Sequence, residues 1–370
     1  MDKFAIFQTP YSPPERSPRE TFDWLIDQAR IADQVGFTEF WCGEHATLLW
    51  EGVPNPELVL AAALRETDHI KLCPGAHLLP YHHPGSLAIQ IAYMTHLANG
   101  RYILGVGAGA FPSDAAVRGI TDLSKNHEMV IESLAIMERV WEAKPFQYNG
   151  KYWSAGYPEH PTSGTPFRDT RPFGGRVDMG MAGLSMESPS IRAAGAGGHI
   201  PLSIYAGPQQ LANHWRTYDE AATKAGRTAD RSVHHVVLDV IVADTDEEAL
   251  KLAVDGGLGR AWREYILATM KGFGVALVRD VMDLDTEAAI KHLAANEWIV
   301  GSPDTVVQKF NALAEKAGGR WGTTMVFGYD YADRPEAWNH SLELLANEVG
   351  PRLRATNADS NDPQSVGSRL

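Results

Sequence analysis

The stretch Phe37-Thr38-Glu39-Phe40-Trp41-Cys42-Gly43-Glu44-His45-Ala46 decides the fold. Its first part, Phe37–Cys42, is short and mostly apolar, which predicts a β-strand. A carboxylate and an imidazole, Glu44 and His45, follow directly after the glycine. Such side chains are poor core material because burying them without partners is costly. In parallel α/β proteins, catalytic residues gather in the loops after the carboxyl ends of strands. The stretch therefore predicts a strand of a parallel sheet that ends in a functional loop.

Strands and helices alternate on both sides of this stretch. Seven further strands are predicted, at Phe4–Gln8, Ile70–Ala76, Arg101–Gly107, Val177–Ala182, Ile200–Tyr205, His234–Ala243 and Thr323–Phe327. Helices are predicted between and after them, at 17–35, 55–67, 84–99, 125–141, 188–196, 208–225, 302–318 and 335–349. Ser-Pro and Asn-Pro pairs open several of these helices, as N-cap and first-turn residues often do. Short apolar strands alternating with helices are typical of a parallel sheet buried on both faces.

Two segments interrupt the alternation. Residues 145–176 are rich in glycine, proline and aromatic residues, and a hairpin is predicted at 146–153 around Asn149-Gly150. Residues 256–297 form a second irregular region with several helices. Long loops of this kind are often lids or binding loops. We therefore expect a single domain over 1–353 with these two insertions, followed by a disordered tail at 354–370.

Composition and charge exclude several function classes. The chain has 370 residues, with 33 Lys and Arg against 46 Asp and Glu, a net charge of −13. That charge argues against a nucleic-acid partner, because binding phosphates needs clustered cations. Cys42 and Cys73 each lie in or at the end of a predicted strand, which does not indicate a disulfide scaffold or a zinc ribbon. Neither a signal peptide nor a run of roughly 18 apolar residues is recognisable, so we expect a cytoplasmic protein without membrane contact.

The pair Glu44 and His45 is the first candidate for chemistry. Imidazole is the usual proton carrier near neutral pH, and a neighbouring carboxylate can hold it in one tautomer and raise its pKa. The alternative is a salt-bridged glutamate beside a core histidine. The position after a strand favours the catalytic interpretation.

Three further histidines, His77, His82 and His83, raise the question of a metal site. Histidines with a carboxylate can bind zinc or iron. However, no His-x-x-x-His pair lies on a predicted helix, and Tyr81–Pro84 has the pattern of a loop. We therefore predict no metal, and expect His77 and His82 to line a substrate pocket. Aromatic residues in or beside irregular regions indicate the same pocket; they include Trp50, Phe111 and Trp153.

Two glycine-containing stretches could hold a cofactor. Leu104–Phe111 carries a Gly-x-Gly-x-Gly pattern, a weak signal that lacks the context of a dinucleotide fold. Its small residues would let a flat ring lie against the backbone, although a tight turn explains them equally well. Met181–Ser190 leads from a strand into a helix and offers serines near the helix N-terminus, which suits an anion such as phosphate. Ser188 and Pro189 could also be a simple helix cap.

Together these residues resemble the bacterial luciferase-like family of flavin-dependent monooxygenases. Within that family the chain is similar to diketocamphane monooxygenases, which are type II Baeyer–Villiger enzymes, and to limonene 1,2-monooxygenases. The stretches that carry the resemblance are Glu44–Ala46, Pro54–Leu58, His77–Pro84, Gly100–Phe111, Lys151–Pro158, Val300–Val306 and Trp321–Thr323.

The resemblance implies an α/β fold, a (β/α)8 TIM barrel with insertions, that binds FMN at its mouth. FMN would arrive as FMNH2 from a separate flavin reductase, and O2 would be the co-substrate. His45, with Glu44 beside it, would lie near the oxygen-reacting face of the flavin. Flavin contacts would come from Ala76, Gly107, Ala108, Gly183, Leu184, Ser185, Ser188 and Ser203. Luciferase has a reactive Cys–Arg pair where Gly107 and Ala108 stand, so Arg192 becomes the candidate for positive charge at the phosphate. A cis peptide would join Gly75 to Ala76.

The implied activity is insertion of one O2 oxygen into a small apolar cyclic ketone through a C4a-peroxyflavin. Three alternatives stay open: epoxidation of an alkene such as a terpene, hydride transfer with deazaflavin F420, and flavin binding without catalysis. In the family an exposed apolar helix face pairs two subunits. Because the predicted helices near 56–67 and 84–98 are rich in Leu, Ile and Ala, we expect a homodimer.

Overall fold

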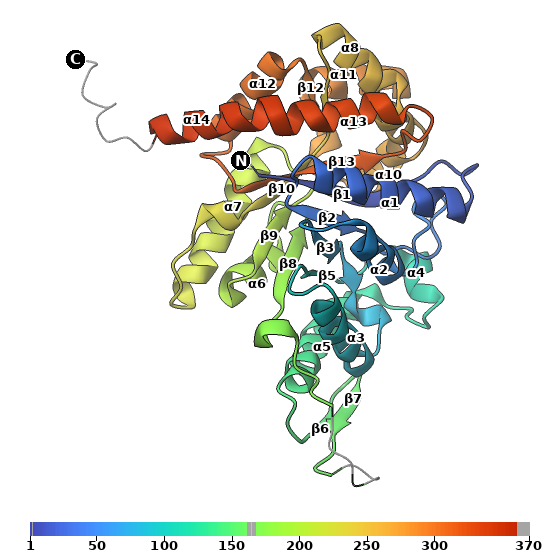
Figure 1. Ribbon diagram of the computed structural model, residues 1–370, viewed down its shortest axis with the longest axis vertical. Helices are drawn as coiled ribbons and strands as arrows, with labels where there is room; N and C mark the ends of the chain where they lie inside the picture. The colour runs from blue at the N-terminus through green and yellow to red at the C-terminus, as the bar shows by residue number, and fades with distance from the viewer. Residues whose placement is uncertain (2, 161–163, 165–167, 361–370) are drawn as a thin grey trace, which may run out of the picture.

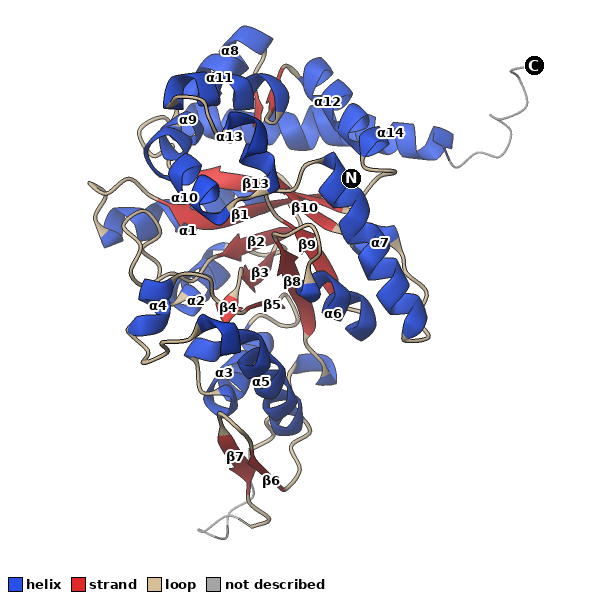
Figure 2. Ribbon diagram, turned by 180° about the vertical axis from the view of Figure 1, so that it is seen from behind, coloured by secondary structure: helices blue, strands red, loops and turns tan. Residues whose placement is uncertain are grey.

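The computed structural model describes residues 1, 3–160, 164 and 168–360, and shows a parallel barrel surrounded by helices (Figure 1 and Figure 2). The strands of its main sheet are β1 (Lys3–Tyr11), β2 (Glu39–Cys42), β3 (Lys71–Pro74), β4 (His77–Leu78), β5 (Ile103–Gly107), β8 (Asp178–Gly183), β9 (Ile200–Ser203), β10 (His235–Leu238) and β13 (Thr323–Tyr329). β1 lies between β2 and β13, and a parallel bridge from Leu72 to Tyr102 joins β3 to β5 and closes the ring. The predicted (β/α)8 barrel is confirmed.

The third barrel strand is divided into two short pieces. β3 pairs with β2, and β4 pairs with β5, so these nine strands occupy eight positions around the barrel. Gly75 and Ala76 lie between the two pieces and are joined by a cis peptide, as the family resemblance implied. The division brings the backbone of Ala76 to the barrel mouth.

The predicted strand His234–Ala243 is not continuous. It divides at the buried residue Asp239 into β10 and β11 (Val240–Val242), and β11 leaves the barrel to pair with β12 (Ile299–Gly301). Asp239 accepts a hydrogen bond from the Tyr329 hydroxyl in the core. Both halves of the stretch are apolar, so the sequence pattern could not reveal the change of partner, and β12 was not predicted.

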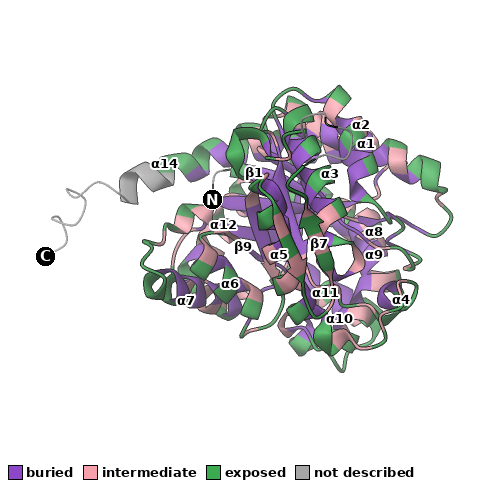
Figure 3. Ribbon diagram, turned by 90° about the horizontal axis from the view of Figure 1, so that it is seen from below, coloured by how far each residue is buried: buried purple, intermediate pink, exposed green. Residues whose placement is uncertain are grey.

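The outer helices follow the predicted positions closely. They are α1 (Pro18–Gln34), α2 (Pro56–Glu66), α3 (Pro84–Leu97), α5 (Asn126–Trp141), α6 (Pro189–Gly197), α7 (Pro208–Lys224), α12 (Pro303–Lys316) and α13 (Pro335–Leu344). α1 begins with a complete capping box between Ser17 and Glu20. Figure 3 shows buried residues concentrated in the strands and exposed residues on the outer faces of the helices.

The barrel interior is closed by the fully buried indole of Trp41 on β2. A Cβ atom on Gly180 would lie 2.9 Å from this ring, and one on Gly105 would lie 3.0 Å from it. Glycine at both positions therefore leaves the space that the indole fills. Apolar packing of this kind supports the strand ends above it.

The first insertion forms the predicted hairpin and extends away from the barrel (Figure 1). Its strands are β6 (Phe146–Asn149) and β7 (Ser154–Tyr157), and they pair antiparallel. The second insertion contains α9 (Gly257–Ala261), the π-helical turn η5 (Trp262–Ile266), α10 (Leu267–Phe273), the 3-10 helix η6 (Ala276–Val281) and α11 (Thr286–Asn296). Two further helices belong to the loops after barrel strands, α4 (Pro112–Ala116) and α8 (Asp246–Asp255).

The C-terminal region is more ordered than predicted. After α13 the chain continues through the π-helical turn η7 (Leu345–Val349) into α14 (Gly350–Ser360). The expectation of disorder is therefore wrong for residues 354–360, because Leu353 is buried and its carbonyl accepts a hydrogen bond from Arg320. The expected tail at 361–370 lies outside the described residues. Among the described helices, none combines the length and apolar character needed to cross a membrane.

Candidate active site at the barrel mouth

A cavity of about 390 Å³ opens at the carboxyl ends of the barrel strands. Its wall combines small residues, aromatic rings, serines and two carboxylates. The residues that line it are Phe7, Thr9, Tyr11, Glu44, His45, Glu51, Gly75, Ala76, Leu78, Val106–Phe111, His127, Ala182, Leu184, Ser185, Ser188–Ser190, Ile204, Tyr205, Met270 and Phe273. A larger hollow of about 720 Å³ lies on the outer surface between α8, α11 and α12, away from the strand ends. Only the first cavity contains the residues predicted for chemistry.

His45 follows β2 and is held between two carboxylates that sequence reasoning missed. Its Nδ1 lies 3.0 Å from Asp114 Oδ2, and its Nε2 lies 3.1 Å from Glu51 Oε2. The side chain is 16% exposed, and its ring meets the Phe111 ring edge-on at 5.2 Å. With both ring nitrogens occupied, the imidazole has one fixed orientation on the cavity wall.

The two carboxylates are themselves anchored. Asp114 Oδ1 accepts hydrogen bonds from the backbone N–H groups of Ala46 and Thr47, at 3.1 and 2.9 Å, and from the Thr47 hydroxyl at 2.6 Å. Glu51 Oε1 accepts a hydrogen bond of 2.6 Å from the hydroxyl of Tyr265, which belongs to the second insertion. Three segments that are distant in sequence therefore meet around the His45 imidazole: the loop after β2, helix α4 and the second insertion. Each side chain in this cluster is held in place by a contact with another.

The electrostatics favour a protonated His45. Burial by itself lowers the pKa of His45, but the charges of Glu51, Asp114 and Glu44 outweigh burial and raise that pKa above its ordinary value. Burial works against ionisation of Asp114 as well, yet its bonds to His45 and Thr47 hold the pKa of Asp114 well below the usual range. Burial raises the pKa of Glu51. The surroundings of His45 therefore favour its protonated form, beside an aspartate whose ionised form is favoured.

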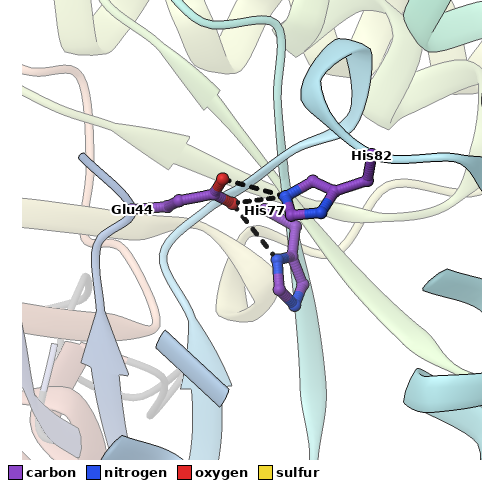
Figure 4. Close-up of side chains that lie close together, drawn as sticks. All are labelled: Glu44, His77 and His82. Carbon is purple, nitrogen blue, oxygen red and sulfur yellow. Dashed lines mark hydrogen bonds and ion pairs between the residues drawn. The ribbon is translucent and has the colours of Figure 1, made fainter. Parts of the chain in front are cut away.

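Glu44 does not orient His45, contrary to the sequence prediction. Although it lines the cavity, its carboxylate lies 2.9 Å from His82 Nε2 and 3.3 Å from His77 Nδ1 (Figure 4). It also accepts a hydrogen bond of 3.1 Å from the backbone N–H of Leu78. The side chains of neighbouring residues in an extended loop point to opposite sides. Glu44 and His45 are therefore adjacent in sequence, but their side chains are not in contact. Glu44 instead anchors the segment that carries Ala76 to the cavity.

His77 and His82 lie behind the cavity wall and do not line it, which corrects their assignment to the substrate pocket. His77 is buried, and its Nε2 lies 2.8 Å from Glu57 Oε1, which also accepts a 2.6 Å hydrogen bond from the Tyr102 hydroxyl. Burial lowers the pKa of His77, but Glu44 and Glu57 outweigh burial and raise it to about 9. His77 is therefore a buried cation between two carboxylates.

The same cluster has the residue types of a metal site. Among the described residues, Glu44, His77 and His82 bring potential ligand atoms within 4.8 Å of one another. The carboxylate of Glu44 already accepts several hydrogen bonds, however, and Arg118 Nη2 lies 3.5 Å from it. A divalent ion would have to displace these protons next to a guanidinium. The geometry favours an ion-pair network, and the absence of a metal stays a prediction.

His77 should make folding stability depend on pH in the alkaline range. Because its pKa rises from 6.5 to about 9 on folding, its contribution is fully present below about pH 6.5 and is lost as the pH rises through about 9. The shift corresponds to roughly 3 kcal/mol. We expect His77→Gln to be less stable than the wild type at pH 6.5, with a difference that shrinks towards pH 10. Urea unfolding across this range measures it. A gap independent of pH, or an equal trend in the exposed control His83→Gln, would rule out the bridging role.

The predicted flavin contacts form two parts of the cavity wall. Ala76, Gly107 and Ala108 make a floor of small residues, and a Cβ atom on Gly107 would lie 3.2 Å from Ala76 Cβ and 2.9 Å from Leu78 Cδ2. Leu184, Ser185 and Ser188 line the cavity at the N-terminus of α6. Ser188 also caps α6 by accepting a hydrogen bond from the Ile191 N–H at 3.3 Å. Both interpretations of this serine, helix cap and cavity residue, are therefore compatible.

Several other predicted site residues lie elsewhere. Gly183 lies behind Ser188, and Trp50 stacks on Tyr265 beside the cavity. Ser203 is buried between His214 Nδ1 and His234 Nε2, 2.8 Å from each. It supports the serine loop indirectly, because His214 Nε2 lies 2.8 Å from the Ser185 carbonyl oxygen.

Trp153 and Arg192 also lie away from the cavity. Trp153 belongs to the hairpin insertion and packs against His83, because that insertion extends away from the mouth. Arg192 is exposed and is not on the wall. Among the described residues that line the cavity there is no lysine or arginine. The serine loop therefore offers hydroxyls and backbone N–H groups in place of a cation.

The missed residues share one signal. Tyr11 ends β1, Glu51 follows β2, Asp114 follows β5 and Tyr205 follows β9, so all four stand at the carboxyl side of barrel strands. Met270 and Phe273 come from α10 in the second insertion. Polar side chains at the carboxyl end of a barrel strand are candidates for a functional site, as Glu44 and His45 were. Applied to every strand, this criterion selects Tyr11, Glu51, Asp114 and Tyr205.

Comparisons with known proteins cover most of the chain. The model of the luciferase-like monooxygenase family matches residues 2–320. The 3,6-diketocamphane 1,6-monooxygenase of Pseudomonas putida is 42% identical, over 95% of this chain and 98% of that protein. Limonene 1,2-monooxygenase of Rhodococcus erythropolis is 29% identical, over 98% and 92%. A solved structure of the oxygenating constituent of 3,6-diketocamphane monooxygenase from Pseudomonas putida, a type II Baeyer–Villiger monooxygenase in complex with FMN, is 44% identical, with a TM-score of 0.89 over 94% of this chain and 98% of that one.

Proposed function

The chain belongs to the luciferase-like monooxygenase family, and we propose that it uses reduced FMN and O2 to insert one oxygen atom into a small apolar cyclic ketone. The proposal draws on the relatives named above and on the cavity itself. The observation that carries it is the His45 imidazole, held between Asp114 and Glu51 on the wall of a cavity at the barrel mouth. A separate flavin reductase would supply the reduced cofactor, as in two-component enzymes.

The residues present fit a flavin. A volume of about 390 Å³ falls in the range of small-molecule sites, and the floor of Ala76, Gly107 and Ala108 has room for a flat ring. Ser185 and Ser188 lie at the N-terminus of α6, where hydroxyls and unpaired backbone N–H groups suit a phosphate. FMN, when bound in its reduced form, supplies the electrons that activate O2. The chain would position the flavin, place charged groups beside it and limit the access of water.

Each group on the wall has a role in that chemistry. The His45 imidazolium stabilises negative charge that develops on oxygen, and Asp114 and Glu51 keep it charged and oriented. Phe111, Met270 and Phe273 form an apolar section of the wall, which would limit the loss of activated oxygen as hydrogen peroxide.

Epoxidation of an alkene is the second candidate, favoured by the similarity to limonene 1,2-monooxygenase. The test is reconstitution with FMN, a flavin reductase and NADH, on a bicyclic ketone and an alkene with the same ring skeleton, with products identified by mass spectrometry. We expect a lactone from the ketone and little epoxide. Epoxide as the main product would support the second candidate. Turnover with F420 in place of FMN, or substrate-independent retention of flavin without O2 consumption, would overturn both.

Ser188 should bind the flavin phosphate. Ser188→Ala removes a hydroxyl from the phosphate loop and is expected to weaken FMN binding about ten-fold, since hydrogen bonds to charged groups are the stronger class. Fluorescence titration of FMN measures this. The matched control is Thr245→Ala, because Thr245 also caps a helix, α8, but lies away from the cavity. If both variants change FMN affinity equally, the effect comes from lost stability, and the assignment of the phosphate is wrong.

We also propose a homodimer that buries the outer faces of α2 and α3. Four large apolar side chains are exposed there: Leu58, Ile89, Tyr93 and Leu97. Ile89→Arg is expected to convert the dimer to a monomer, because it places an unpaired charge in an apolar interface. Light scattering after gel filtration measures the mass. Leu250→Arg on α8 is the control, since Leu250 is 47% exposed against 52% for Ile89. A dimer that survives Ile89→Arg would place the interface elsewhere.

A further inference from the structure

We propose that the paired hydroxyls of Tyr11 and Tyr205 bind the carbonyl oxygen of the substrate. The inference rests on the proposed function, because it names the feature by which the cavity recognises its substrate. It predicts a preference for a ring that carries a hydrogen-bond acceptor over the same ring without one. Neither tyrosine was selected from the sequence.

The geometry brings the two rings together at the cavity from different strands. Tyr11 ends β1 and Tyr205 follows β9, and both line the cavity. Their hydroxyl oxygens lie 2.5 Å apart. The Tyr11 ring stacks on Tyr329 at 5.8 Å, and the Tyr205 ring stacks on Phe327 at 4.8 Å. Both hydroxyls are therefore held in place by buried aromatic packing.

The backbone of Tyr205 supports a functional reason for this placement. Its φ is +50°, in the left-handed region that residues other than glycine and asparagine seldom adopt. Such a conformation is strained, and it persists where the surrounding structure holds a side chain in a required position. Here the conformation accompanies a ring whose hydroxyl lies beside that of Tyr11 at the cavity.

Counting protons shows that the pair has a donor to spare. Two hydroxyls carry two protons, and the bond between them uses one. Thr9 Oγ1 lies on the same wall and has no hydrogen-bond partner among the described residues. If Thr9 accepts the second proton, its own proton becomes the free one. An open chain of hydroxyls thus ends in one unused O–H, and all three of these side chains line the cavity.

An unused donor on the wall of a binding cavity calls for an acceptor on the ligand. A buried polar group without a partner is costly. A substrate that supplies an oxygen atom therefore gains a hydrogen bond that an apolar substrate cannot form. In attack on a ketone, the carbonyl oxygen gains negative charge as its double bond opens, and a positioned hydroxyl stabilises that charge. An alkene has no such oxygen. Burial raises the pKa of both tyrosines well above the usual value, so both remain neutral donors at physiological pH.

The pair lies on the same side of the cavity as His45. The ring of Tyr11 packs against that of Tyr265 at 6.1 Å, and Tyr265 donates to Glu51, which contacts His45. A ketone held by the tyrosine hydroxyls would therefore lie in the same cavity as His45. The cavity then provides one donor for the substrate and one charged group for oxygen.

The test compares Tyr11→Phe, Tyr205→Phe and the double variant with the wild type. Equilibrium binding of a bicyclic ketone and of the matched hydrocarbon is measured by calorimetry on the flavin-free protein, alongside FMN affinity and turnover with FMN and reductase. We expect the double variant to bind the ketone about three- to ten-fold more weakly and to lose about a hundred-fold in kcat/KM. Hydrocarbon and FMN affinities should not change. Each single variant should lose less, because one free O–H remains.

Tyr218→Phe is the control, since Tyr218 is buried on α7 and stacks on Trp215 outside the cavity. Ketone binding and kcat/KM of the double variant within two-fold of this control would overturn the inference. A loss of FMN affinity with unchanged ketone binding would overturn it too, and would assign the hydroxyls to the flavin. If the wild type neither binds nor converts any cyclic ketone, the proposed function itself fails. The single variants keep the test decisive should the double variant not fold.

Discussion

Replacing His45 with alanine is expected to lower product formation about a hundred-fold while O2 consumption continues and hydrogen peroxide accumulates. Asp114 and Glu51 hold the imidazole on the wall of the cavity whose small-residue floor is proposed to hold the flavin ring, and they favour its positively charged form. Without that charge, negative oxygen species are less stable and escape as peroxide before they reach the substrate.

The measurement is the ratio of product formed to NADH consumed, with peroxide assayed in parallel. His83→Ala is the matched control, because His83 is exposed outside the cavity and contacts Ser154 and Trp153. Unchanged coupling in His45→Ala would remove His45 from the chemistry. An equal loss in His83→Ala would show that the effect is structural.

Asp114→Asn should move the pH dependence of coupling towards acid. Asparagine can still accept the backbone N–H groups of Ala46 and Thr47, but it presents an amide to His45 Nδ1 in place of a charged acceptor. Burial then lowers the pKa of His45, because the charge of Asp114 no longer counteracts it. In the wild type, activity that requires the imidazolium persists above pH 6.5 and declines as the pH rises through the raised pKa. In the variant the decline should occur at lower pH.

The profile of coupling from pH 5.5 to 9.5 gives the result directly. Asp122→Asn is a suitable control, since Asp122 also accepts a backbone N–H, that of Ser124, but lies outside the cavity. An unshifted alkaline limb in Asp114→Asn would mean that coupling does not depend on the charge of His45. A lower rate with an unshifted profile would limit Asp114 to holding the loop.

Much of the fold was accessible from sequence because local signals coincide with global ones. The apolar run before Gly43 predicted a strand, and the ionisable pair Glu44 and His45 after it predicted a functional loop. Ser188-Pro189 predicted a helix start, and that start became part of the cavity wall. In each case a residue's role depends on chain neighbours within one turn or one strand. Such roles are visible without coordinates.

The partners of His45 were not accessible in the same way. Asp114 is 69 residues from His45, and Tyr265 is 214 residues from Glu51. Only closure of the barrel and folding of the second insertion bring them together. The adjacency of Glu44 and His45 in sequence led to a wrong prediction, because the Glu44 side chain contacts His77 and His82 instead. Trp153 failed for a similar reason, since aromatic content does not tell in which direction an insertion extends.

The cluster around His77 and the cluster around His45 are predicted to have different functions. His77 with Glu44 and Glu57 fixes the segment that carries Ala76, so its loss should change stability more than chemistry. His45 with Asp114 and Glu51 faces the cavity, so its loss should change chemistry more than stability. Comparing His77→Gln with His45→Ala in both assays separates the two roles.

Oxygen-18 labelling tests the central claim most directly. The wild-type protein is supplied with FMN, a flavin reductase, NADH and a bicyclic ketone under 18O2, and the product is analysed by mass spectrometry. We expect a lactone that carries one oxygen-18 atom, formed only when reduced FMN is present. A product without the label, or a labelled product that forms equally well without the flavin, would contradict the claim that a reduced flavin activates O2 beside His45.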